Sequence, residues 1–211
     1  MRRSACVAST AAAALVGLAV VAGVGGGSAA QAPTAPPFMF FLTHYELIGD
    51  ANNPTGVRYS STGAPFAKAR DGSRITFTGQ GGWDPATRRA TGTGSYVIRN
   101  AAGAVRTRGT WTATQFIDFR QLAGWWDIAN FKEEGWQGPP GSASFSGFLR
   151  LRVSLSAGGR GVLRLWCLMP GVPKPKGHMG DGLSFMSRGG LRFTDFRAQE
   201  RTLEGVMFYS R

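Results

Sequence analysis

Residues 147–156 alternate with a period of two, which is the pattern of a β-strand with one buried face. The two faces hold Leu149, Leu151, Val153 and Leu155 on one side and Arg150, Arg152, Ser154 and Ser156 on the other. Ala157-Gly158-Gly159 follows, and glycine readily takes the positive φ of a tight turn. Residues 160–168 return with Leu163, Leu165 and Cys167 on one face. The pattern predicts an antiparallel hairpin whose arginines face water.

A second hairpin is predicted over residues 95–111. Its first arm is 95–99, its turn is Asn100-Ala101-Ala102-Gly103, and its second arm is 105–111. Alternation sets Val105 and Trp111 against Arg106 and Arg108, so the arginines again face outward. Six further strands are expected where aromatic and β-branched residues gather between turn signals, at 39–47, 74–78, 115–120, 183–187, 191–196 and 205–209.

About ten strands and no sustained helical period predict an all-β fold, either a single antiparallel β-barrel or a sandwich. Glycines recur inside or beside these strands, as in 79–82 and 92–94. Glycine weakens a strand unless a bulge or a sharp bend needs the missing side chain, and closed barrels need such bends. The glycines therefore favour a barrel over a sandwich.

The N-terminus has the pattern of a secretory signal peptide. Arg2 and Arg3 precede the apolar stretch 11–24, and small residues at 28–30 offer a cleavage site. The apolar stretch is shorter than the roughly 20 residues of a spanning helix, so cleavage is favoured over an uncleaved anchor. The predicted organisation is a signal peptide at 1–30, a Pro-rich tether at 31–37 and a barrel domain at 38–211. The expected location is extracellular or periplasmic.

The chain is strongly cationic, with a formal net charge of +12. Removal of Arg2 and Arg3 with the leader would leave 12 − 2 = +10. Such a charge attracts anionic envelope polymers, lipid headgroups or nucleic acid, although the sequence shows no nucleic-acid recognition module. The closest approach to a basic patch is Arg150, Arg152, Arg160 and Arg164. A bias for arginine over lysine also follows from a GC-rich genome, so both interpretations stay open.

Catalysis has one candidate set, in and before a loop rich in Pro and Gly at 171–182. His178 would act as a general base, Asp181 would orient its ring, and Cys167 would be the nucleophile. The alternative is a solvated loop beside a cysteine that is a small buried apolar residue. His44 and Glu46 alternate onto one strand face, but a zinc site needs three or four ligands. No metal or cofactor is predicted.

A tryptophan-rich segment at 124–140 is the candidate ligand-binding region. Trp125, Trp126 and Trp136 lie there among polar residues such as Asp127. Exposed aromatic rings beside carboxylates and amides suit the stacking of a sugar. The alternative is that these tryptophans plug one end of the barrel, since large aromatic residues contribute most by burial.

The spacing of glycine and aromatic residues resembles that of a known barrel family. The pattern is Gly79-x-Gly-Gly-Trp83-Asp84, then Ala90-Thr91-Gly92-x-Gly94-Ser95-Tyr96, then Gly109-Thr110-Trp111. It resembles the allene oxide cyclase and dirigent type of small barrel. The resemblance implies a calycin/dirigent-like barrel whose interior admits an apolar small molecule. Separately, residues 167–182 resemble a loop of uncharacterised secreted bacterial proteins.

Three functions follow as expectations. The first is non-catalytic binding of a small apolar or amphipathic molecule by the barrel. The second is a cyclase-like or isomerase-like enzyme that uses the barrel pocket. The third is a carbohydrate-binding or envelope-binding module that uses 124–140.

Overall fold

The computed structural model describes residues 35–50, 53–60, 63–125, 132–135, 144–168, 180–195 and 204–210, and every regular element in them is a β-strand. The all-β class is therefore confirmed. The strands are β1 (Phe38–Asp50), β2 (Asn53–Ser60), β3 (Phe66–Ala69), β4 (Arg74–Phe77), β5 (Gln80–Asp84), β6 (Arg89–Arg99), β7 (Val105–Trp125), β8 (Lys132–Glu134), β9 (Phe145–Leu155), β10 (Arg160–Cys167), β11 (Gly182–Ser187), β12 (Arg192–Asp195) and β13 (Glu204–Ser210).

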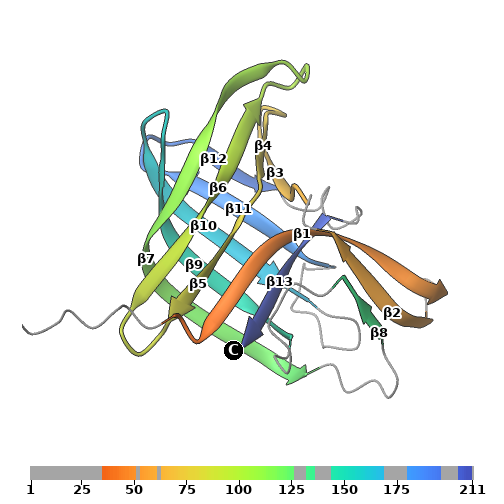
Figure 1. Cartoon of the computed structure of the whole chain (residues 1–211). Coiled ribbons are helices and arrows are strands. Elements are labelled where there is room, and N and C mark those ends of the chain that lie inside the picture. Colours follow the sequence, from red (N-terminus) through yellow and green to blue (C-terminus); the bar gives the residue numbers. More distant parts are fainter. Residues whose placement is uncertain are drawn as a thin grey trace, which may run out of the picture. The chain divides into compact units, whose positions relative to one another are not determined.

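Eight of these strands close into an antiparallel barrel. They follow one another in the order β4-β3-β12-β11-β10-β9-β7-β6, and the ring closes because β6 pairs with β4 (Figure 1). The remaining strands pair outside this ring. A closed ring satisfies the backbone groups that the edges of an open sheet would expose. The predicted barrel, rather than the sandwich, is the observed architecture.

Both predicted hairpins are present, but the register between β6 and β7 shifts at Ile98 and Arg99, and Val105, predicted on the face away from the arginines, is 40% exposed. Leu151 lies opposite Leu163 and Leu149 opposite Leu165, and all four side chains are buried. The turn between β9 and β10 uses Gly158 at φ 91° and Gly159 at φ 105°, in the left-handed region that glycine favours. In the second hairpin, the amide of Asn100 donates to the carbonyl of Ala104 at 2.9 Å.

The structure differs from the sequence prediction in several strands. β2, β3, β5 and β8 were not expected. The predicted strands 105–111 and 115–120 are one continuous strand, β7, whose register shifts between Ala113 and Gln115 and between Phe116 and Asp118. These bulges interrupt the alternation, so the sequence looks like two strands where the chain forms one.

Four tight turns lie at the same end of the barrel. They join β3 to β4, β6 to β7, β9 to β10 and β11 to β12, and each joins neighbours in the ring. Because the strands are antiparallel, turns that join alternate pairs must meet at one end. We call this end the turn rim, made of residues 69–74, 99–106, 155–160 and 187–192.

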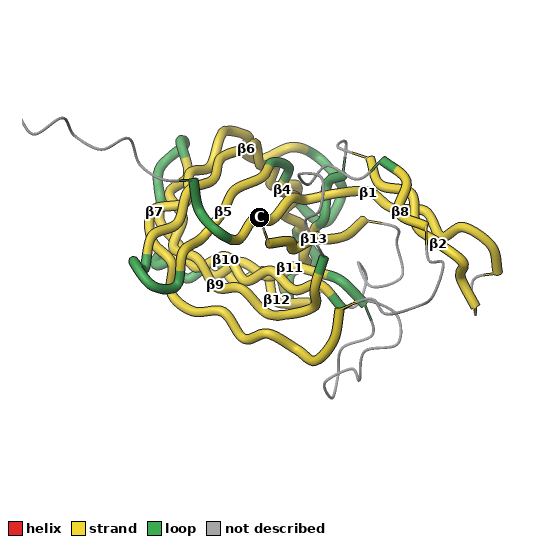
Figure 2. The backbone as a smooth tube through the Cα atoms, turned by 60° about the horizontal axis from the view of Figure 1, so that its bottom comes forward, coloured by secondary structure: helices red, strands yellow, loops and turns green. Residues whose placement is uncertain are grey.

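The opposite end is covered by strands from the two chain termini. β1 pairs with β5 on one edge and with β13 on the other. β13 in turn contacts β9, β10 and β11, and Tyr209 forms a bridge with Ser144 just before β9. Figure 2 shows the strands as a ring with the C-terminal end of β13 in front of its centre. We call this the covered end.

The barrel interior is packed with aromatic rings that follow one another along it. Successive ring centroids lie between 5.5 and 6.4 Å apart. This aromatic column consists of Phe185, Phe77, Trp111, Phe40, Trp83 and Phe208, all fully buried.

Gly94 lies where the column needs backbone space. A Cβ on Gly94 would lie 1.8 Å from the carbonyl oxygen of Thr78 and 2.7 Å from the indole nitrogen of Trp111. That same nitrogen donates to the Thr78 carbonyl at 2.8 Å. At this position a glycine is needed because the backbone of β6 closely approaches Thr78 and Trp111, as expected for glycines in a closed barrel.

Residues 35–211 form one compact unit that contains every described strand. The predicted signal peptide, 1–30, and most of the tether, 31–37, lie outside the described residues, so both stay predictions. Among the described residues, no helix is long and apolar enough to cross a membrane.

Candidate functional site

The catalytic candidates Cys167 and Asp181 both make contacts that stabilise the fold. Cys167 is only 2% exposed and belongs to the main core with Leu163 and Leu165. One carboxylate oxygen of Asp181 accepts from the amide of Leu168 at 2.6 Å, and the other accepts from the amide of Val206 at 3.3 Å. Asp181 thereby ties the end of β10 to β13. His178 lies outside the described residues, so its predicted role stays a prediction.

Tyr45 is the third ionisable group beside Asp181 and Cys167. Burial raises the pKa of its phenol far above the ordinary value, and the nearby charges of Asp181 and Cys167 raise it further. A phenol in this position keeps its proton throughout the physiological range. It therefore acts as a neutral neighbour of the Asp181 carboxylate.

The tryptophan-rich segment falls largely outside the described residues. Trp126, Asp127 and Trp136 are in undescribed positions, and only the backbone of Trp125 is placed, opposite Phe145 at the end of β7. The predicted sugar platform and the alternative plug both stay predictions. The three other tryptophans, Trp83, Trp111 and Trp166, are fully buried.

The pair His44 and Glu46 shares a strand face as predicted, with His44 Nε2 and Glu46 Oε1 4.0 Å apart. The Glu46 carboxylate also lies 3.7 Å from Arg58. Within the described parts of the chain, no group of three or more His, Cys, Asp and Glu side chains is placed to hold a metal ion.

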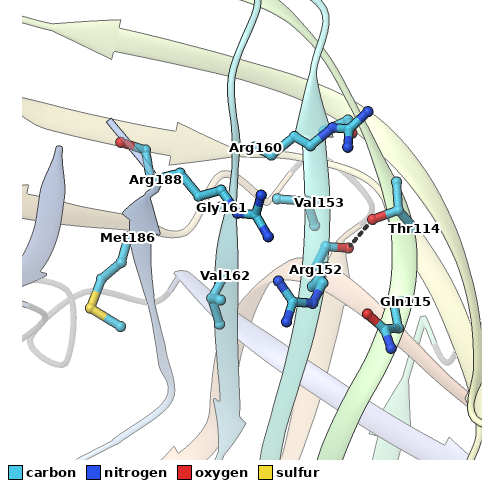
Figure 3. A pocket seen from close by; sticks show the side chains of 11 residues that line it. Thr114, Gln115, Arg152, Val153, Arg160, Gly161, Val162, Met186 and Arg188 are labelled. Carbon is cyan, nitrogen blue, oxygen red and sulfur yellow. Dashed lines mark hydrogen bonds between the residues drawn. The ribbon is translucent and has the colours of Figure 1, made fainter. Parts of the chain in front are cut away.

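A groove on the outer wall of the barrel is the clearest candidate site. It crosses β7, β9, β10 and β11, shares Arg160, Ser187 and Arg188 with the turn rim, and has a volume of about 540 Å³ (Figure 3). We call it the outer groove. Its lining residues are Thr114, Gln115, Arg152, Val153, Ser154, Arg160, Gly161, Val162, Met186, Ser187 and Arg188.

The strand register explains why the outer groove combines arginine with apolar side chains. Arg152 on β9 lies opposite Val162 on β10, and Val162 lies opposite Met186 on β11. Met186 is in turn opposite Arg192 on β12. One row across four strands therefore reads basic, apolar, apolar, basic. Figure 3 shows the side chain of Arg188 extending across β10 toward Arg152.

The outer groove carries positive charge that no carboxylate of the described residues pairs with. Among the described residues, Arg152, Arg160 and Arg188 form no ion pair, and the lining residues include no acid. The next row toward the covered end is different. There Arg150 forms an ion pair and hydrogen bonds with Asp118, and the pKa of Asp118 is lowered, chiefly by that hydrogen bond.

The sequence analysis did not predict this site, and only two of its eleven lining residues belong to the basic patch named there. Arg152 and Arg160 were in the predicted basic patch, while Arg150 is paired with Asp118 and Arg164 lies outside the lining. Arg188, Thr114 and Gln115 were missed because only the pairing of β7 and β11 with their neighbours brings them to the same wall.

The chain was compared with protein-family models, with curated proteins and with solved structures, and none of the three comparisons gives a match. The resemblance to allene oxide cyclase and dirigent barrels therefore stays a prediction.

Proposed function

We propose that the protein is a non-catalytic binding protein, and that the outer groove takes a small amphipathic anion. The observation that carries this proposal is that Arg152, Arg160 and Arg188, which pair with no acid among the described residues, line one groove together with Val162 and Met186. The volume of about 540 Å³ lies within the usual range for small-molecule sites.

The chemistry of the lining defines the ligand class. A guanidinium group presents several N–H donors in a plane and matches carboxylate, sulfate or phosphate oxygens. Val162 and Met186 offer contact to a short hydrocarbon body, and a methionine side chain adapts to different shapes. Ser154, Thr114 and Gln115 add hydroxyl and amide groups at the margin. A ligand with one anionic head and a short apolar body uses all three features.

Calorimetric titration with three probes tests this proposal. Hexyl phosphate carries both parts of the proposed ligand, inorganic phosphate carries only the anion, and hexanol carries only the apolar body. We expect hexyl phosphate to bind more tightly than either partial probe. Arg152→Ser should weaken its binding about tenfold, because a hydrogen bond to a charged group contributes about 1.5 to 3 kcal/mol.

Arg120→Ser is the matched control, since Arg120 is also exposed, on β7, but lies toward the covered end. Val162→Ser should weaken hexyl phosphate but leave inorganic phosphate unchanged. If Arg120→Ser lowers affinity as much as Arg152→Ser does, the protein acts only as a diffuse cation and the proposed site is wrong.

A second candidate is an apolar ligand inside the barrel, as the sequence analysis expected. One observation favours it: the indole N–H of Trp83 is fully buried and has no acceptor among the described residues. A carbonyl or hydroxyl oxygen of an interior ligand would satisfy that donor. Mass spectrometry of extracts from purified protein tests this, and a clean extract from both the parent chain and Trp83→Phe would reject it.

The predicted leader supports export as part of the proposal. N-terminal sequencing of the protein recovered outside the cytoplasm should begin near Gln31. Recovery only in the cytoplasm, with Met1 retained, would contradict it.

A further inference from the structure

The exposed large apolar side chains of the described residues lie in the turn rim or next to it. Three large ones are exposed: Leu191 at 52%, Val105 at 40% and Met186 at 40%. Leu191 lies in the turn between β11 and β12, Met186 lies just before that turn, and Val105 directly follows the turn between β6 and β7. Isolated exposed apolar residues are ordinary on protein surfaces, but their confinement to one end is a pattern.

The same end is strongly basic. Residues 69–74, 99–106, 155–160 and 187–192 contain seven arginines and one aspartate, a net charge of 7 − 1 = +6. The aspartate is Asp71, whose carboxylate accepts from the hydroxyl and the amide of Ser73 at 2.5 and 3.0 Å. These bonds lower its pKa, and Arg106 contributes to the same shift.

The four turns of the rim are short. Small residues fill them, as in Ala101-Ala102-Gly103-Ala104, Ala157-Gly158-Gly159 and Gly189-Gly190. A Cβ built on Gly103, Gly158, Gly159 or Gly190 meets no atom within 4 Å, so these turns leave open space at this end. Val105 lies in a part of β7 that pairs with β6 alone, because β7 pairs with β9 only from Trp111 onward.

We propose that the turn rim docks on the surface of an anionic phospholipid bilayer. Arginine groups are attracted to the negative headgroups, and Leu191 and Val105 reach the boundary between headgroups and acyl chains. Charge alone would suit any polyanion. The exposed apolar side chains at the same end specify lipid, because a polysaccharide or nucleic acid offers no comparable apolar layer. This inference uses the rim and does not depend on occupation of the outer groove.

Vesicle co-sedimentation of the compact unit 35–211 tests the proposal without the apolar N-terminal stretch. The probes are vesicles of phosphatidylcholine alone and of phosphatidylcholine mixed with phosphatidylglycerol. We expect binding only to the anionic vesicles, and weakening by added salt. Arg70→Ser and Arg106→Ser should each reduce partitioning about fivefold, from the usual contribution of a basic residue near an anionic surface.

The apolar half of the proposal needs its own variant. The double variant Val105→Ser and Leu191→Ser keeps the charge and should reduce partitioning about tenfold. Arg120→Ser, toward the covered end, should retain most of the binding. All variants in this experiment lie outside the groove lining. Failure of vesicle binding would therefore not count against hexyl phosphate binding, and failure of hexyl phosphate binding would not count against vesicle binding.

Two outcomes would overturn the proposal. One is that Arg120→Ser reduces vesicle binding as much as Arg70→Ser or Arg106→Ser does. That result would mean that the net charge of the protein, and not one oriented surface, causes binding. The other combines three results. The rim arginine variants lose vesicle binding, the double apolar variant keeps it, and a soluble polyuronate binds the protein as tightly as the anionic vesicles do. That result identifies a polyanion site instead of a lipid-docking surface.

Discussion

The two ends of the barrel differ in almost every property that the described residues show. At the covered end, the rings of Phe38 on β1 and Phe208 on β13 each pack against Trp83 on β5 and Phe145 on β9, and Trp83 and Phe208 are fully buried. At the turn rim, short Gly-rich and Ala-rich turns carry arginines and exposed apolar side chains.

This difference separates stability from recognition. Buried aromatic rings contribute most to folding, while side chains on turns add little to it but are free to meet a partner. The covered end thus holds the strands from both chain termini on the barrel. The rim and the outer groove next to it can change charge and shape with little effect on the fold.

The largest contrast should come from truncating one side chain at each end. Phe208→Ala removes a ring that contacts Trp83, Phe119 and Phe145, and should lower the free energy of unfolding by about 3–5 kcal/mol. Leu191→Ala should change it by less than about 0.5 kcal/mol. Urea unfolding followed by circular dichroism measures both. Similar losses for the two variants would mean that the rim is as structural as the covered end.

A second contrast compares glycines in the interior and on the rim. Gly94→Ala forces a methyl group against the Thr78 backbone and should cost about 3 kcal/mol or more. Gly158→Ala meets no atom within 4 Å, so only its positive φ of 91° opposes it, at about 1–2 kcal/mol. Unfolding midpoints compare the two. If Gly94→Ala is the milder change, the close packing described around Trp111 is wrong.

A substitution of Asp181, near the covered end, distinguishes a structural role of this residue from a catalytic one. Asp181→Ala leaves the amides of Leu168 and Val206 without their acceptor, and should lower stability by about 2 kcal/mol. Asp181→Asn keeps one oxygen and should lose less. Hydrogen exchange at the Leu168 and Val206 amides measures the effect locally. Unchanged protection of both amides in Asp181→Ala would contradict the structural role.

The smallest effect concerns the ion pair of Asp118 and Arg150, next to the outer groove. The hydrogen bond from Arg150 lowers the pKa of Asp118, so the pair stabilises the folded state at neutral pH. Its contribution is lost as the pH falls through this lowered pKa. Both side chains are nearly half exposed, so the contribution is at most about 1 kcal/mol. The stability difference between the parent chain and Asp118→Asn should disappear in acid, and its persistence there would exclude this mechanism.

Local patterns were enough to predict the barrel wall. Alternation over β9 and β10 identified the buried face, and the glycine turn at 157–159 fixed their pairing. The outward direction of Arg152 and Arg160 on this wall was also predictable. β5 and β3 were not, because they are short and their apolar faces become evident only once Phe40 and Phe193 pack nearby.

Long-range pairing is what the sequence could not supply. The outer groove needs Thr114, Arg152 and Met186 on one wall, and these residues lie far apart along the chain. The role of Asp181 likewise depends on Val206, which approaches only because β13 crosses from β1 toward β9. Such contacts follow from ring closure, and no short motif encodes them.

The most direct test of the proposed binding site is a titration of the isotopically labelled protein with hexyl phosphate, followed through backbone amide shifts. If the outer groove is the site, the amides of Arg152, Gly161, Val162 and Met186 shift together and saturate with one affinity. Shifts confined to β1 and β13 at the covered end, or shifts spread evenly over all arginines without saturation, would contradict it.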